Sequence, residues 1–159
     1  FYATINKLIT FDNNKLVSIG SRLLSQDYRM TEIPMFCVQI KVRDTGYDAG
    51  YCDDKCWWNV DQLECVYVEP ENLDGWEEFG YKDRWETVMV AFTEKGCQEF
   101  LELDGHNVRR MAHNGEVRIY VHSFNRCPEM IAVRKDLILK YHTHEQKNKY
   151  AYREPDNKA

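Results

Sequence analysis

The sequence lacks several features that mark common classes of protein. It contains no apolar run of the roughly 18 residues that a membrane-spanning helix requires, so we expect no membrane partner. It carries no glycine-rich phosphate loop, no Ser-His-Asp order and no His-Glu-x-x-His motif. It also lacks an excess of positive charge, and its net charge of −5 argues against non-specific binding to nucleic acid or to an anionic membrane.

The chain does have a globular composition. Of its 159 residues, 43% are apolar and 13% are aromatic, which is not the composition of a disordered chain. This length suffices for one domain with a sizeable core. We predict a single domain over residues 1–145 and a flexible polar tail over residues 146–159.

Charge is unevenly distributed along the chain. Residues 44–86 contain thirteen acidic residues and three basic ones, Lys55, Lys82 and Arg84. Residues 106–141 reverse the balance, with seven Lys and Arg residues and three acidic ones. Two explanations are open: the two segments attract each other within the fold, or they steer partners of opposite charge.

The first part of the chain predicts one helix and three strands. From Asn13 or Asn14, apolar residues recur at helical spacing as far as residues 26–27, and Gly20 marks either a weak helix or close packing. Residues 35–43 alternate between apolar and polar side chains, which predicts a half-buried strand with a polar outer face. Two short strands, at residues 56–58 and 65–68, are expected to form a hairpin.

The middle of the chain predicts a loop, a strand and a helix. Residues 69–80 are acidic and contain Pro70 and two glycines, so we expect a loop. Residues 85–92 are apolar on both faces, which predicts a central strand. Thr93 is the expected start of a helix, and Gly105 is its expected end.

The last part predicts a hairpin and a helix. Asn114-Gly115 is typical of a type I′ turn, expected to join strands at residues 108–112 and 117–123. Pro128 opens a helix whose apolar pattern ends after Tyr141. The whole order of elements predicts an α+β fold, a single domain with a mainly antiparallel sheet on which the helices pack.

A pattern of short motifs runs through the second half of the chain. It comprises Gly80, Tyr81, Trp85, Glu86, Phe92, Thr93, Glu94, Gly105, His106, Asn107, Arg118, Ile119, Tyr120, Arg126, Pro128 and Glu129. In this pattern the sequence resembles a family of uncharacterised small proteins of bacteriophages and prophages, although Cys127 stands where that family has Asn. The resemblance implies a phage or prophage origin and a place in the cytoplasm of a bacterial host. It implies no chemistry.

Three cysteines are the candidate metal ligands. Cys52, Cys56 and Cys65 are spaced so that the first two resemble the paired ligands of a structural zinc site, with Cys37 or a distant His as the fourth ligand. No second paired motif accompanies them. Structural zinc, a Cys52–Cys65 disulfide and free thiols in a reducing compartment all remain open, and we favour free thiols without a cofactor.

Two groups of residues suggest alternative activities. His106 and Asn107 are expected to follow a helix end, and His106 would act as a general base if Arg118 and Arg126 held an anionic substrate. Arg118, Tyr120 and His122 alternate along one predicted strand and therefore share a face, which could bind single-stranded nucleic acid or a nucleotide.

The leading hypothesis rests on the acidic aromatic stretch of residues 69–85. Its aromatic residues are expected to fold onto the core or to face a partner: Trp76, Phe79, Tyr81 and Trp85. With its acidic neighbours, such a stretch suits a basic protein surface. The sequence therefore favours a non-enzymatic phage accessory protein that binds a host bacterial protein, and one form of this hypothesis is an inhibitor of a defence or nucleic-acid enzyme. The oligomeric state is left open.

Overall fold

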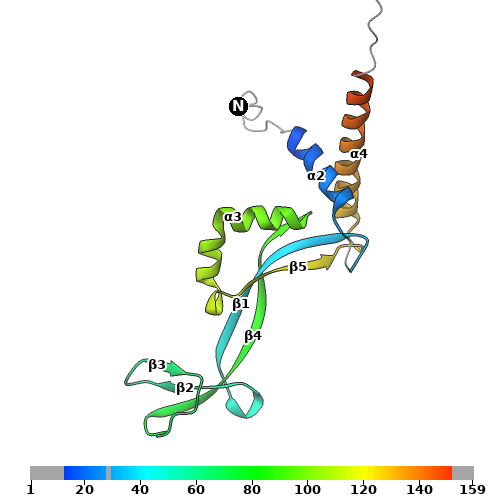
Figure 1. Ribbon diagram of the computed structural model, residues 1–159. Helices are drawn as coiled ribbons and strands as arrows, with labels where there is room; N and C mark the ends of the chain where they lie inside the picture. The colour runs from blue at the N-terminus through cyan, green and yellow to red at the C-terminus, as the bar shows by residue number, and fades with distance from the viewer. Residues whose placement is uncertain (1–12, 28–29, 152–159) are drawn as a thin grey trace, which may run out of the picture. The chain divides into compact units, whose positions relative to one another are not determined.

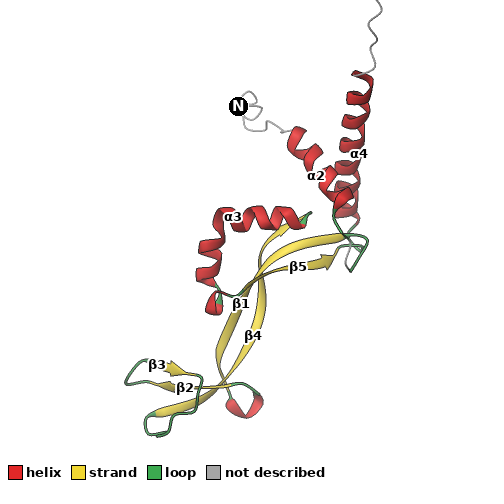
Figure 2. Ribbon diagram, viewed as in Figure 1, coloured by secondary structure: helices red, strands yellow, loops and turns green. Residues whose placement is uncertain are grey.

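The structure is a computed structural model that describes residues 13–27 and 30–151. Within these residues the chain forms three α-helices and a five-stranded antiparallel sheet, so the predicted α+β fold is confirmed (Figure 1 and Figure 2). The helices are α2 (Asn13–Ser25), α3 (Glu94–Met111) and α4 (Pro128–Ala151). The strands are β1 (Pro34–Tyr47), β2 (Lys55–Asn59), β3 (Glu64–Val66), β4 (Trp76–Ala91) and β5 (Val117–Ser123).

The sheet has the strand order β3-β2-β4-β1-β5. The predicted hairpin of β2 and β3 is confirmed, with Trp58 opposite Cys65, and β2 also pairs antiparallel with β4. Two hydrogen bonds give the register of β5 on β1: Phe124 donates to the Ile33 carbonyl, and Lys41 donates to the Glu116 carbonyl. The residue numbers rise in one strand as they fall in the other, so this pair is antiparallel as well.

The chain divides into two compact units that share β1, β4, β5 and α3. The first, here the helix-pair unit, comprises Phe1–Cys37, Met89–Phe100 and Ile119–Ala159. The second, here the hairpin unit, comprises Val38–Val88 and Leu101–Arg118. Each unit has buried apolar residues of its own.

The helix-pair unit is built around the contact between α2 and α4. Its buried apolar side chains are Leu23, Phe36, Cys37, Cys97, Phe124 and Leu137. Gly20 lies where the two helices meet: a Cβ atom there would overlap the Leu137 carbonyl oxygen and lie 2.9 Å from the Cβ of Tyr141. Close packing, one of the two explanations that the sequence left for Gly20, is therefore the reason for this glycine.

Helix α3 begins as predicted but ends later. The Thr93 hydroxyl accepts a hydrogen bond from the Gly96 amide at 3.1 Å, as an N-cap does. The helix then continues through Gly105 to Met111, so the predicted end at Gly105 and the strand at residues 108–112 are both wrong. The helix continues because its buried face continues. Cys97 and Val108 are both buried and lie eleven residues apart, about three helical turns, so they share one face of the helix.

The turn at Asn114-Gly115 has the predicted backbone and a different role. Asn114 and Gly115 have φ values of 54° and 71°, as a type I′ turn requires. They belong to the short 3₁₀ helix η2 (His113–Gly115), which links α3 to β5 and joins no hairpin. The predicted strand at residues 117–123 is β5 itself.

Strand β1 is more buried than its alternating pattern suggests. Gln39 was expected on a polar outer face, yet it is buried together with Cys37, Val38 and Ile40. β1 lies between β4 and β5 and is therefore an interior strand. The predicted central strand is β4, between β2 and β1, but it begins at Trp76 and so shortens the acidic loop.

Helix α4 begins at Pro128, as predicted, and runs to Ala151. It thus extends ten residues beyond Tyr141, where the apolar pattern ends, and includes residues 146–151 of the expected tail. Residues 152–159 of that tail lie outside the described part of the chain. None of the helices in the described ranges is both long and apolar enough to cross a bilayer.

Candidate functional site

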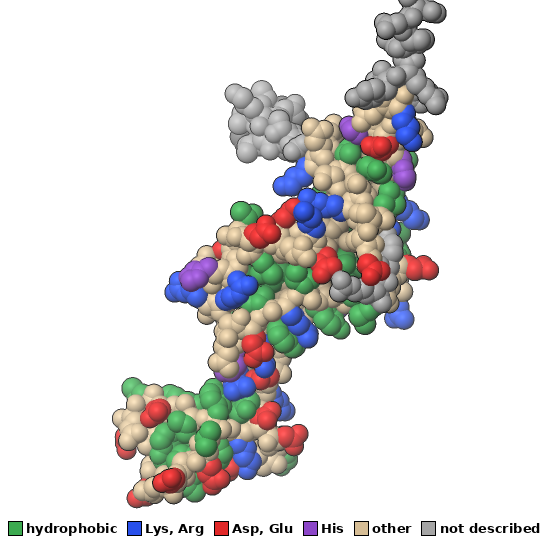
Figure 3. Space-filling view, viewed as in Figure 1, with side chains coloured by type: hydrophobic (Ala, Val, Ile, Leu, Met, Phe, Trp, Pro, Cys, Tyr) green, Lys and Arg blue, Asp and Glu red, His purple; other side chains and the backbone are tan. Residues whose placement is uncertain are grey.

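The main candidate site is a set of exposed apolar side chains around β2 and β3, here called the hairpin surface. Tyr51, Leu63 and Val68 expose 86%, 76% and 79% of their surface. The other members are Val60, Tyr67 and Leu73. Figure 3 shows apolar and acidic side chains gathered over the part of the molecule that holds this hairpin. Soluble monomers rarely expose apolar side chains in such a group, and a polar rim is typical of a binding surface.

Acidic residues surround these apolar ones. The exposed carboxylates of the hairpin surface are Asp53, Asp54, Asp61, Glu64, Glu69, Glu71 and Asp74. The nearby basic residues are committed to other contacts: Lys55 binds Glu78 at 2.7 Å, Arg84 binds Asp44 and Glu86 at 2.7 Å each, and the Lys82 Nζ lies 5.0 Å from the centre of the Tyr47 ring. The hairpin surface therefore presents apolar groups in a negative field.

A clamp centred on Arg43 of β1 holds Tyr67, one member of this surface, in place. The guanidinium lies 4.6 Å from the ring centre of Tyr67 and 3.9 Å from that of Tyr81. It also donates two hydrogen bonds to the carboxylate of Asp83, from Nε at 2.6 Å and from Nη2 at 2.7 Å. The Tyr67 and Tyr81 rings meet edge to face, with their centres 5.4 Å apart. The clamp therefore ties Tyr67, which follows β3, to residues of β1 and β4.

The electrostatics of the clamp agree with its geometry. The hydrogen bonds from Arg43 lower the pKa of Asp83 to about 2, against a partly opposing effect of burial. The same carboxylate raises the pKa of Arg43. Burial is the main cause of a raised pKa at Tyr67, while its hydrogen bond to Arg43 acts in the opposite direction. Both charges of the pair are thus stabilised in the folded protein.

The predicted aromatic residues lie along β4. Trp76 stands opposite Asn59, and Phe79 stands opposite Cys56 on β2. Both are half-buried, so they line the base of the hairpin and do not form its outer surface. Tyr81 belongs to the clamp, and Trp85 receives the Arg118 guanidinium over its ring at 4.0 Å.

Sequence reasoning missed Arg43 and the exposed residues of the hairpin surface. Tyr51 lies in a turn-rich run, Leu63 in the turn of the expected hairpin and Val68 at the end of an expected strand, and none of these positions indicated which side chains would be exposed. The acidic composition of residues 44–86 was the one available clue. Nothing local in the sequence indicates that Arg43 meets Tyr67 and Tyr81, because these contacts join separate strands.

Arg118 takes part in a polar chain across the sheet. Its Nε donates to the Gln39 Oε1 at 2.9 Å, and the Gln39 Nε2 donates to the Thr87 hydroxyl at 3.1 Å. On the same strand, Tyr120 and His122 meet edge to face with ring centres 4.9 Å apart, and both are exposed. The proposed nucleic-acid face thus keeps its two rings, while its arginine is engaged with Trp85 and Gln39.

His106 and Asn107 lie inside α3, and the turn expected at these residues is wrong because the helix continues through them. Both side chains are exposed, and the Asn107 amide donates to the Asp104 carboxylate at 2.6 Å. Arg126 is exposed in the segment between β5 and α4 and belongs to the helix-pair unit, whereas His106 belongs to the hairpin unit.

All six cysteines are free thiols. Cys56 of β2 is buried. Its pKa is raised to about 11, mainly by burial and secondly by the nearby Cys65. Cys52 lies against Gly80, where an added Cβ would be 2.5 Å from its sulfur. Over residues 13–27 and 30–151, no three His, Cys, Asp or Glu side chains are grouped so that they could hold a metal ion.

No family model, curated protein or solved structure matches this chain.

Proposed function

We propose that this protein is a non-enzymatic binding module whose hairpin surface docks on a basic surface of another protein. The observation that carries the proposal is the group of exposed apolar residues within an acidic rim, led by Leu63 and Val68. Apolar contacts supply most of the affinity of such a surface, and the carboxylates steer a basic partner toward it.

The Arg43 clamp supports this proposal. A surface that is already ordered loses little conformational entropy when it binds. Arg43 joins Tyr67 to β1 and β4 through two ring contacts and a paired carboxylate. Tyr67, one of the apolar residues of the hairpin surface, would therefore meet a partner already in place.

The resemblance to small phage and prophage proteins extends the proposal to the identity of the partner. On that basis we propose a phage accessory protein, acting in the cytoplasm of a bacterial host, whose partner is a host protein. A basic surface that normally receives nucleic acid has the required charge, so inhibition of a defence or nucleic-acid enzyme is the form of action that we favour.

The test compares capture by matched variants. The tagged chain is incubated with nuclease-treated bacterial lysate beside a Leu63→Ser/Val68→Ser variant and a Leu103→Ser control. Leu103 of α3 is 89% exposed and lies outside the hairpin surface. We expect one protein that the wild type and the control retain, that the double variant loses, and that elutes as the salt concentration rises. Equal capture by all three forms, or capture that salt does not weaken, would contradict the proposal.

The two alternative functions have tests of their own. Titration with single strands, duplexes and nucleotides at low salt tests binding by Arg118, Tyr120 and His122. If an enzymatic activity were found, a His106→Ala variant would show whether His106 carries it. Arg118 is held by Trp85 and Gln39, so it offers less to a nucleic acid than its position in the sequence suggests.

A further inference from the structure

A second surface lies in the helix-pair unit, where a cavity of about 190 Å³ opens beside β5. Its apolar walls are Phe36 of β1 and Ile119 and Val121 of β5. Met30 lies at its edge and is 75% exposed. The cavity is smaller than the 300–1,000 Å³ typical of sites for drug-sized ligands, so its size suits a single side chain.

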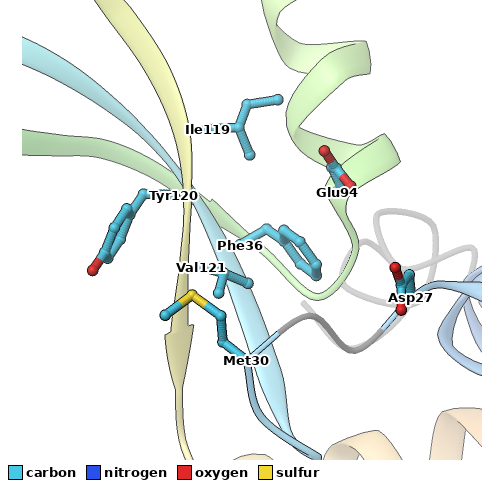
Figure 4. A pocket seen from close by; sticks show the side chains of 7 residues that line it. All are labelled: Asp27, Met30, Phe36, Glu94, Ile119, Tyr120 and Val121. Atoms are coloured by element: carbon cyan, nitrogen blue, oxygen red, sulfur yellow. The ribbon is translucent and has the colours of Figure 1, made fainter.

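Two carboxylates give the cavity its chemistry. Asp27 follows α2 and Glu94 is the first residue of α3, and both line the cavity. Figure 4 shows the Phe36 ring between these carboxylates and the side chains of Val121 and Met30. An apolar wall with acidic groups at one side matches a lysine or arginine side chain, whose stem is apolar and whose head is a cation.

The cavity lies next to an open sheet edge. β5 is the last strand in the sheet order, and β1 is its only strand neighbour among the described residues. The register places Phe124 and Glu116 in hydrogen-bonded contact with β1, so the even-numbered residues of β5 direct their backbone groups toward β1. The amides and carbonyls of Ile119 and Val121 therefore point away from the sheet.

This edge has few of the features that usually prevent pairing. Native edge strands are protected by charged side chains, by proline or by bulges. β5 contains no proline and no glycine, its one Lys or Arg is Arg118, whose guanidinium lies over the Trp85 ring, and Ile119, Tyr120 and Val121 favour strands. Ile119 and Val121, two of the residues with outward backbone groups, also line the cavity, together with Tyr120 between them.

We propose that the edge of β5 binds an extended segment of a partner protein as an added strand and that a lysine or arginine of this segment enters the cavity beside Asp27 and Glu94. Backbone hydrogen bonds to Ile119 and Val121 provide affinity, and the acidic cavity selects the basic residue. The proposal does not depend on the hairpin surface, which involves other residues of the chain.

The first experiment selects peptides from a displayed library of random ten-residue segments. It uses the full chain, an Asp27→Asn/Glu94→Gln variant and a Glu129→Gln control. Glu129 is an exposed acid in the first turn of α4, as Glu94 is an acid in the first turn of α3, but it does not line the cavity. We expect the wild type and the control to enrich segments with one Lys or Arg between β-branched residues.

The best of these peptides is then synthesised, and its affinity is measured by fluorescence anisotropy. The double variant should bind it about tenfold more weakly, because two charge contacts are lost. Met30→Lys should weaken binding similarly, since it places a competing cation beside the cavity at an exposed position that does not endanger folding. Hydrogen exchange should show that the peptide protects the Ile119 and Val121 amides.

Several results would overturn the proposal. These are no enrichment, enriched peptides without a basic residue, equal binding by the double variant, or binding without protection of the two amides. Protection of the same amides by self-association, detected by sedimentation at rising protein concentration, would identify a second copy of the chain as the occupant and would also overturn it.

Discussion

A different kind of interaction is prominent inside each of the two units of this protein. In the helix-pair unit, apolar side chains such as Leu23, Phe124 and Leu137 are buried, and Arg22–Glu99 is an ion pair between α2 and α3 at 2.7 Å. The hairpin unit is crossed by ion pairs of Lys41, Arg43, Lys55 and Arg84. Both units bury some apolar side chains and expose others, Met30 and Leu139 in the helix-pair unit and Leu63 and Val68 in the hairpin unit, so the density of ion pairs is what distinguishes them.

The largest effect is expected from the core of the helix-pair unit. Leu23 is completely buried, so Leu23→Ala should lower the free energy of unfolding by about 3 kcal/mol through lost burial and the cavity left behind. Urea unfolding followed by circular dichroism measures the loss. Leu24→Ala is the matched control, because Leu24 is 43% exposed and should cost much less. Similar losses for both variants would show that the core is not where the structure places it.

The crossing of α2 and α4 should be nearly as sensitive. A methyl group at Gly20 overlaps the Leu137 carbonyl oxygen, so Gly20→Ala should cost about 2 kcal/mol even though alanine favours helices. Thermal unfolding measures this loss. Ser18→Ala, at another position of α2, provides the helix-propensity control. Stabilisation by Gly20→Ala would mean that the helices do not approach closely.

In the hairpin unit, the shape of the Arg43 side chain should matter as much as its charge. Arg43→Lys keeps the charge but loses the paired hydrogen bonds to Asp83 and the flat group between Tyr67 and Tyr81. We expect a loss of about 1 kcal/mol in urea unfolding. The more exposed Arg84→Lys should lose less. Equal losses would show that the rings add nothing to the clamp.

Acid should weaken the same clamp. The pKa of Asp83 is about 2 in the folded protein and 3.8 as its ordinary value, so its stabilisation is fully present above the ordinary pKa. That stabilisation is lost as the pH falls from about 4 to about 2. The difference in unfolding free energy between wild type and Asp83→Asn should therefore shrink across this range. A difference that stays constant would mean that the carboxylate is not paired in solution.

The smallest effect is expected at the exposed pair of Lys55 and Glu78. Their side chains are 41% and 42% exposed, so water and salt screen the attraction at 2.7 Å. Lys55→Ala should leave the unfolding midpoint within experimental error at 1 M salt. The loss from Leu23→Ala should be the same at low and high salt. If salt changed both losses equally, the distinction between the two units would fail.

The parts of the fold that the sequence predicts are those that local patterns encode. Thr93 as a cap, Pro128 as a helix start and the hairpin of β2 and β3 depend on neighbouring residues. The glycine signal at Gly105 was misleading, since a helix can continue through glycine when its buried face resumes beyond it.

The candidate site was harder to predict than the fold. The acidic aromatic segment was identified, but the clamp was not, because Arg43 finds Asp83 forty residues away across two strands. The burial of Gln39 was also missed, since its polar side chain indicated an outer face. Contacts between distant residues leave no periodic trace, and the chemistry of a surface depends on them.

The chain of hydrogen bonds from Arg118 through Gln39 to Thr87 has a consequence for how the sheet assembles. Gln39 is 6% exposed, and its amide is satisfied only when the two neighbouring strands present an arginine and a threonine at its own level. A slip of either strand by one residue turns the required side chain to the opposite face and leaves a buried amide without its partner. Gln39 therefore makes incorrect strand registers unfavourable. A purely apolar strand of Val and Ile would tolerate such registers.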